Sequence, residues 1–281
     1  MRRLPAPTDT CIATFRTCVA RVGDAERKAR LTSVENDIDR KHADYVAAAQ
    51  VAALHTFPQA SGVAHIVSDV ELQNLYSRQL VVQDTPARLI YDRLLSAAPS
   101  GTCPLCGEQT AKTLDHHLPK SRYAAISVTP CNLVPACRDC QSAKLEKFPS
   151  TAGEQTLHPY FDDLDTERWL IGSVIQGAPA VIAFDLVSPP GWSAVKQERY
   201  HRHLTILDLR SRFSLFSARE LVNIRWQLGQ LHAAGGAAAV KRHLEDTADS
   251  RRVAWLNSWQ TAMYEACAAS DWFCTTGFAL G

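Results

Sequence analysis

Four cysteines in two close pairs form the most chemically specific pattern in the chain. Two residues separate Cys103 from Cys106, and after 30 further residues Cys137 and Cys140 repeat that spacing. Four thiolates in two such pairs can close a tetrahedral shell around Zn²⁺, and a closed shell is structural because it leaves no position for water. Gly107 follows the first pair and permits the tight turn of a zinc knuckle. We therefore predict a structural zinc site rather than four unrelated buried thiols.

Between the two pairs lies a short run that combines a carboxylate with two imidazoles, Asp115–His116–His117. A neutral imidazole can take a proton from water, and a carboxylate can hold a hard cation such as Mg²⁺ or Mn²⁺. Adjacent residues of a strand point to opposite faces, so a twist at the strand end is needed to turn Asp115 and His116 toward one cation. By itself the triplet is a weak signal of catalysis.

The residues that follow predict a loop, a second strand and a helix. Asn132 lies in an apolar stretch that leads into the second cysteine pair, and residues 138–147 can form a short helix. On that helix Gln141 and Lys144 are one turn apart and share a face. The segment thus has the order strand, loop, strand, helix, with a histidine at the end of its first strand and polar groups on its helix.

The combined pattern LDHxLPKS…NLVPxCxxCxxxK, which lies between residues 103 and 144, resembles the HNH nuclease family. The resemblance implies a ββα-metal fold of the type braced by a four-cysteine zinc site. It implies that His116 is the general base that activates water and that Asp115 ligates the catalytic Mg²⁺ or Mn²⁺. It further implies that Asn132 hydrogen-bonds across the loop to orient His116, and that Lys144 lies near the substrate phosphates.

Two positions depart from the family pattern, and a third histidine follows the segment. The family usually has Asn or His where this chain has Gln141, whose amide oxygen could still bind the divalent ion but stands one methylene further out. His117 occupies a position that is often apolar or aromatic; it could pack, contact DNA or supply the missing ligand, and we favour packing. His158 belongs to a His-Pro-Tyr-Phe-Asp element found in some bacterial HNH proteins. It could add to the site, but a packed aromatic clasp is the better interpretation.

Helices must hold this segment on both sides. Apolar residues recur at helical spacing before it, as in Leu72, Leu75 and Leu80. We expect helices over 25–44, 67–80 and 86–98 with a connector over 55–62, then one or two strands within 169–187, then helices over 195–207, 217–233, 238–247 and 250–269. The expected fold class is α+β and mainly α-helical. Residues 1–100 would form a helical N-terminal region, 101–150 an HNH module, and 151–281 a mostly helical C-terminal region with a short strand segment.

The C-terminal region carries weaker signals. Residues 196–252 hold eleven Lys or Arg against six acidic residues, an excess that could grip phosphates or could simply be solvated. Aromatic residues at helical spacing are expected to pack rather than to stack on bases, namely Trp255, Trp259, Tyr264, Trp272 and Phe273. The remaining cysteines are expected to be ordinary thiols, namely Cys11, Cys18, Cys131, Cys267 and Cys274.

Composition bounds the class of protein. With 46% hydrophobic and 21% charged residues over 281 positions, the chain is neither disordered nor fibrous, and a net charge of +1 excludes a uniformly basic nucleic-acid coat. No apolar run approaches the ~18 residues of a membrane helix, and the N-terminus lacks the apolar core of a secretory signal. Nine cysteines, four of them in CxxC pairs, favour metal binding in a reducing compartment over disulfides. We expect a cytoplasmic protein with no membrane partner.

These patterns predict a metal-dependent HNH endonuclease that hydrolyses phosphodiester bonds, most of all in double-stranded DNA. From the resemblance we expect a prokaryotic restriction or anti-phage effector beside an ATPase or sensor partner. The alternative is a zinc-knuckle nucleic-acid-binding or adaptor protein whose catalytic site has decayed, which Gln141 favours and Asp115 and His116 oppose. A cysteine-based redox protein would need an exposed CxxC within a βαβ pattern, and the sequence has neither.

Overall fold

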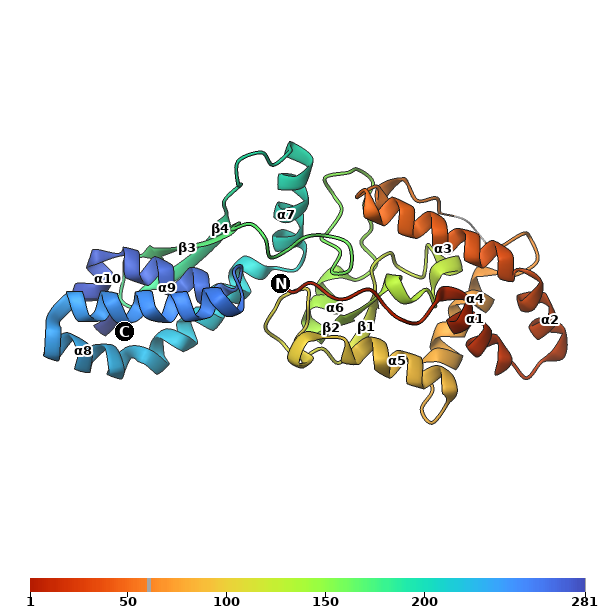
Figure 1. Ribbon diagram of the computed structural model, residues 1–281, viewed down its shortest axis with the longest axis horizontal. Coiled ribbons are helices and arrows are strands. Elements are labelled where there is room, and N and C mark those ends of the chain that lie inside the picture. The colour runs from red at the N-terminus through yellow and green to blue at the C-terminus, as the bar shows by residue number, and fades with distance from the viewer. Residues whose placement is uncertain (60–61, 281) are drawn as a thin grey trace. The chain divides into compact units, whose positions relative to one another are not determined.

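A computed structural model describes residues 1–59 and 62–280 of the chain (Figure 1). The chain divides into two compact units, Met1–Asp163 and Leu164–Gly281. Both units are mainly helical, and each contains one two-stranded antiparallel sheet. The expected α+β, mainly helical class is therefore confirmed. The expected regions 1–100 and 101–150 share one unit, whose boundary lies at residue 163 rather than at 150.

The N-terminal helices are α1 Cys11–Ala20, α2 Ala25–Ser33, α3 Glu35–Gln50, α4 Asp69–Leu75 and α5 Pro86–Ser96. The single helix expected over 25–44 is wrong, because the backbone leaves the helical conformation at the fully buried Val34. The helix expected over 67–80 is present as α4, which continues into the π-helical turn η2 Tyr76–Leu80. The expected connector over 55–62 overlaps the 3₁₀ turn η1 Leu54–Thr56, while its residues 60 and 61 lie outside the described residues.

The cysteine-rich segment forms β1 Thr113–His116, β2 Leu133–Ala136 and α6 Arg138–Lys144, in the order that the sequence predicts. The two strands pair antiparallel, with Thr113 opposite Ala136 and His116 opposite Leu133. Two 3₁₀ turns, η4 Ala124–Ile126 and η5 Pro130–Asn132, shape the connection between the strands. Leu114 and Leu133 belong to the same hydrophobic core as the side chains of α1 to α5. The N-terminal helices therefore supply the core on which this small sheet rests.

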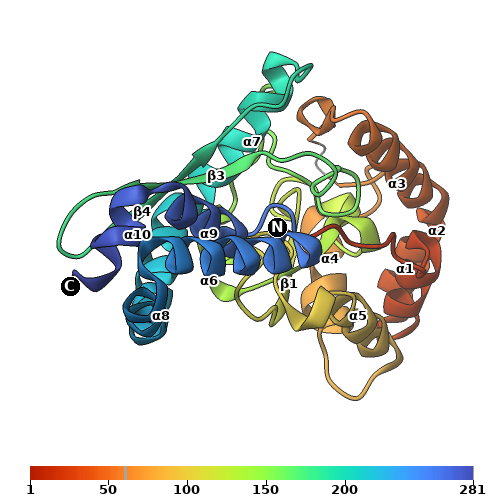
Figure 2. The same cartoon turned by 60° about the vertical axis from the view of Figure 1, so that its left-hand side comes forward.

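The second unit combines a β-hairpin with helices (Figure 2). Its elements are β3 Leu170–Ile175, β4 Val181–Leu186, α7 Ala194–Ile206, α8 Leu209–Ala254, α9 Trp259–Ala269 and α10 Asp271–Thr275. The strands expected within 169–187 are thus confirmed as a hairpin. A glycine lets α9 approach β3 closely, since a Cβ at Gly172 would meet the carbonyl oxygen of Ala262 at 2.6 Å. The long element α8 reverses direction at Gly235 and Gly236, which leave the helical conformation.

Helix boundaries in this unit differ from those expected. The helix expected over 250–269 is wrong, because residues 250–254 end α8 and Ser258 caps a separate helix α9. The break has a tertiary cause: the Asn257 side chain accepts hydrogen bonds from the backbone nitrogens of Trp169 at 2.9 Å and Leu170 at 3.2 Å. Of the expected core aromatics, Trp259, Tyr264 and Phe273 are buried, whereas Trp255 and Trp272 are partly exposed.

None of the helices within residues 1–59 and 62–280 is long and apolar enough to cross a membrane.

Candidate functional site

The four predicted zinc ligands meet in the first unit. Cys103, Cys106, Cys137 and Cys140 are all buried, and their sulfur atoms all lie within 4.8 Å of one another. The Sγ atoms of Cys106 and Cys137 are 3.9 Å apart, too far for the ~2.05 Å of a disulfide. Tetrahedral zinc with Zn–S bonds of ~2.3 Å places its sulfur atoms about 3.8 Å apart. The four thiols therefore fit a metal such as zinc.

Local backbone geometry shapes the two halves of this cluster. Gly107 has a φ of +73°, and a Cβ there would meet the backbone nitrogen of Met1 at 2.7 Å, so glycine is required. The Gly107 nitrogen donates to the carbonyl oxygen of Cys103 at 2.8 Å and closes the first knuckle. Cys137 caps α6, since its sulfur accepts a hydrogen bond from the Cys140 nitrogen at 3.4 Å. The helix and the cluster thus begin at the same residue.

The thiols also couple to one another electrostatically. Hydrogen bonds from Cys103, Cys137 and Cys140 lower the pKa of the Cys106 thiol, whereas hydrogen bonding to Cys103 raises the pKa of Cys140. Four adjacent thiolates repel each other unless a cation lies among them. A divalent ion in this cluster would stabilise all four thiolates at once.

A second feature is a cavity of about 420 Å³ beside the end of β1 and the helix α6. Asp115, His116 and Gln141 line it together, with Lys120 and Glu146. Although Asp115 and His116 are sequence neighbours, both reach this one cavity because they lie where β1 ends. The cavity thus unites an imidazole, a carboxylate and an amide, as the sequence pattern led us to expect.

His116 is held by a backbone carbonyl and an aromatic ring. Its Nε2 lies 2.8 Å from the carbonyl oxygen of Ser127, so Nε2 carries the proton and Nδ1 is left as an acceptor. The ring of Tyr76 packs edge-on against it, with ring centroids 4.4 Å apart. Burial lowers the pKa of His116 to about 3, an effect to which Lys120 and Lys144 add and which the Ser127 hydrogen bond opposes. The imidazole is therefore neutral at neutral pH.

Asn132 is fully buried and cross-links the loop between the two strands. Its Oδ1 accepts from the Leu118 nitrogen at 2.8 Å, and its Nδ2 donates to the carbonyl oxygens of Leu118 at 3.1 Å and Ile126 at 3.3 Å. Because Ile126 immediately precedes Ser127, these bonds fix the stretch of backbone that holds His116. The asparagine acts on the imidazole through the loop rather than by contact.

Lys144, which the resemblance places near the substrate phosphates, is buried and contacts the end of β1. Its ammonium group lies 2.9 Å from Asp115 Oδ2 and donates to the carbonyl oxygen of His116 at 2.6 Å, and its side chain is only 4% exposed. Burial raises the pKa of Asp115, and the ammonium group partly offsets that effect. The lysine therefore ties α6 to the end of β1, and one carboxylate oxygen of Asp115 is already engaged.

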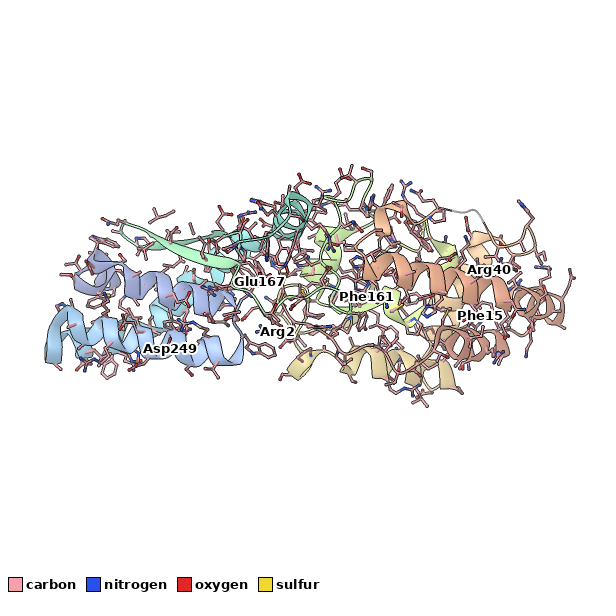
Figure 3. All side chains as sticks on the ribbon, turned by 45° about the horizontal axis from the view of Figure 1, so that its top comes forward. Arg2, Phe15, Arg40, Phe161, Glu167 and Asp249 are labelled. Carbon is pink, nitrogen blue, oxygen red and sulfur yellow. The ribbon has the colours of Figure 1, made fainter. Side chains whose placement is uncertain are left out.

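The two further histidines pack on each other. The ring centroids of His117 and His158 are 4.0 Å apart, and His158 Nε2 lies 2.9 Å from the Tyr45 hydroxyl. Phe161, which is labelled in Figure 3, packs edge-on against His158, with ring centroids 4.7 Å apart. The residues that line the Asp115–His116 cavity in the described part of the chain do not include either histidine. The favoured interpretation of both as packing residues agrees with this arrangement.

Several residues of the site escaped sequence reasoning. No sequence pattern assigns a role to Tyr76 or Glu146, Ser127 contributes a backbone atom, and Lys120 belongs to the pattern LDHxLPKS without a role of its own. The available signal was the position of Lys120 in LDHxLPKS, shortly after the histidines. The other contacts depend on tertiary packing.

Comparisons with known proteins identify a relative but do not show a family. No protein-family model matches the chain, and no solved structure matches it. Protein ea31 of Escherichia phage lambda is 33% identical over 175 residues, which make up 60% of this chain and 58% of that protein. The chain thus spans less than two thirds of that relative, whose name states no activity.

Proposed function

We propose that the first unit is an HNH-type nuclease module and that the protein hydrolyses phosphodiester bonds in DNA, most of all double-stranded DNA. The observation that carries the proposal is the convergence of a buried neutral imidazole, His116, and a carboxylate, Asp115, in one cavity. The β1–β2–α6 order and the attached four-cysteine cluster add support, because both match the family pattern in the sequence.

The donor set of the cavity fits a hard divalent cation. Asp115 has one carboxylate oxygen beyond the one paired with Lys144, and Gln141 offers an amide oxygen. Mg²⁺ takes oxygen ligands and needs only one or two carboxylates, since waters and substrate phosphates complete its shell. When bound, such a cation would polarise the phosphoryl oxygen and stabilise the leaving 3′ oxygen.

The residues of the chain supply the proton transfer and the geometry. His116 accepts a proton from the attacking water at Nδ1, because Nε2 is committed to the Ser127 carbonyl oxygen. Asn132 fixes the loop that carries Ser127, and Lys144 fixes the ends of β1 and α6. The imidazole and carboxylate are thus prepared for reaction before substrate binds.

We extend the proposal, on the family resemblance, to a prokaryotic restriction or anti-phage effector that acts with an ATPase or sensor partner. The His-Pro-Tyr-Phe-Asp element at 158–162, which some bacterial HNH proteins near defence genes share, supports this extension.

Plasmid cleavage by the purified full-length protein tests the proposal, with Mg²⁺, Mn²⁺ or EDTA. We expect nicking that requires the cation and that falls by ~10²–10⁴-fold in His116→Ala, the usual contribution of a general base. His201→Ala is the matched control, because His201 is an exposed histidine of the second unit. The opposite outcome is that the parent fails to cut even with the protein encoded by a neighbouring gene present, the candidate ATPase or sensor partner, while parent and His116→Ala bind DNA equally well. That result would contradict the nuclease hypothesis and support the alternative of a decayed zinc-knuckle DNA-binding protein.

A further inference from the structure

A second cavity, of about 430 Å³, lies in the first unit between α2 and the helix formed by α4 and η2. Its apolar lining includes Leu31 and Leu75, which are 1% and 2% exposed. Three arginines also line it: Arg27 and Arg30 come from α2, and Arg78 comes from η2. An apolar base with several guanidinium groups around it is typical of a site that binds an anion.

The ion pairs around this cavity leave Arg78 without a carboxylate partner among the described residues and give Arg27 only one long contact, with Glu71. Glu71 accepts from the Ser68 nitrogen at 3.0 Å and from Arg30 at 2.5 Å, so its charge is already matched. Arg27 Nε lies 3.9 Å from the same carboxylate, beyond hydrogen-bonding distance. Arg78 forms no ion pair with any carboxylate in the described part of the chain. The residues of the lining carry three positive charges against one negative charge.

We propose that this cavity binds a phosphate group through the guanidinium groups of Arg27 and Arg78. Planar guanidinium groups match the geometry of phosphate oxygens and can donate two hydrogen bonds each. Asn74 and Gln79 line the same cavity and add neutral amide donors. The buried Leu31 and Leu75 limit the access of water from one side, which strengthens such charge-assisted hydrogen bonds.

The helix formed by α4 and η2 links this cavity to the candidate nuclease site. Gln73 lines the Asp115–His116 cavity, whereas Asn74 and Arg78 line the second one. Tyr76 lies between Asn74 and Arg78 in the sequence, and its ring packs on His116 of the first cavity. A nucleic-acid strand bound at the first cavity and crossing this helix would present a backbone phosphate to the second. This choice of ligand rests on the proposed function; a free phosphate ion shares the same chemistry.

The test compares Arg27→Ala/Arg78→Ala with the parent in binding a short DNA duplex and inorganic phosphate, both without added Mg²⁺ or Mn²⁺ and without a chelator that would remove the structural zinc. Fluorescence anisotropy follows the duplex and calorimetry follows the phosphate. We expect about a tenfold weaker duplex affinity and a salt dependence shallower by about one phosphate contact. The matched control is Arg16→Ala/Arg93→Ala, which removes two charges that are paired with Glu35 and Asp9. Its duplex affinity should stay within about twofold of the parent.

Each outcome decides the matter. A loss specific to Arg27→Ala/Arg78→Ala supports a site for backbone phosphate. An unchanged duplex affinity, with inorganic phosphate bound by the parent but not by the variant, supports the same site with a free ion. An equal loss in the control, or no change with either probe, overturns the proposal. Because no Mg²⁺ or Mn²⁺ is added and the assay does not depend on cleavage, an absence of nuclease activity leaves this readout intact, and circular dichroism confirms that both variants are folded.

Discussion

Lys144–Asp115 in the first unit and Lys196–Glu167 in the second have almost the same nitrogen–oxygen distance, 2.9 and 2.8 Å. Their surroundings differ: the side chains of the first pair are 4% and 11% exposed, and those of the second are 36% and 41% exposed. Solvent screens the exposed pair, whereas removing one partner of the buried pair would leave a charge without compensation.

The two ion pairs differ because polar groups near the cavity of the first unit are buried and held by hydrogen bonds, whereas the charges of the second unit's α8 are mostly exposed. In the first unit Asn132, His116 and Lys144 are buried and each makes specific hydrogen bonds to backbone atoms. In the second unit most charged side chains of α8 are exposed. Buried polar groups are costly unless they are satisfied, so their concentration around one cavity is itself a signal of a site.

The largest effect is expected from the cysteine cluster. Cys140→Ser removes one of four ligands, and because structural zinc contributes folding free energy directly, the first unit should lose its metal and its stable fold. Cys274→Ser in the second unit is the control, since this buried thiol belongs to no such cluster among the residues that the structure describes. Zinc content by elemental analysis and limited proteolysis measure the outcome. A Cys140→Ser protein that is protease-resistant and retains one zinc per chain would contradict the site.

The next largest effect concerns the buried ion pair. Lys144→Met should lower the free energy of unfolding by about 3 kcal/mol, because Asp115 would remain buried without its partner. Lys196→Met should change it by no more than about 1 kcal/mol, as for exposed pairs. Urea denaturation of both variants measures the difference. Equal effects at the two positions would remove the contrast between the units.

The sequence predicted local features well and tertiary ones poorly. The two CxxC spacings predict the cluster of Cys103, Cys106, Cys137 and Cys140, because a short turn brings the two cysteines of each pair together. The burial of Lys144 and its hydrogen bond to the His116 carbonyl oxygen could not be predicted, since both depend on where α6 lies against β1. The same holds for the carbonyl oxygen of Ser127, and for the helix break at Asn257, whose side chain bonds to Trp169 far along the chain.

Acid should destabilise the first unit through His116. Its pKa is lowered to about 3 in the folded protein, against an ordinary value near 6.5. Between about pH 6.5 and pH 3 the imidazole therefore binds a proton in the unfolded chain but not in the folded protein. Stability should therefore fall by about 1.4 kcal/mol per pH unit as the pH drops from about 6.5 toward 3. His116→Gln should lack this slope. The variant thereby separates the effect of the buried imidazole from destabilisation by acid release of zinc. Identical slopes in parent and variant would show that the buried imidazole is not the cause.

The smallest effect is expected from the basic residues of α8. Arg219 and Lys241 are both exposed, so Arg219→Gln/Lys241→Gln should change the free energy of unfolding by no more than about 0.5 kcal/mol. DNA binding separates the two interpretations of this basic segment. If the surface is only solvated, the salt dependence of DNA affinity should be unchanged. If the surface binds phosphates, each lost contact should reduce the slope of log affinity against log salt concentration by about one. We expect the first result, because the side chains of Arg219 and Lys241 are exposed and solvated, unlike the buried Lys144 of the first unit. A shallower salt dependence in this variant, with stability unchanged, would instead assign DNA binding to both units.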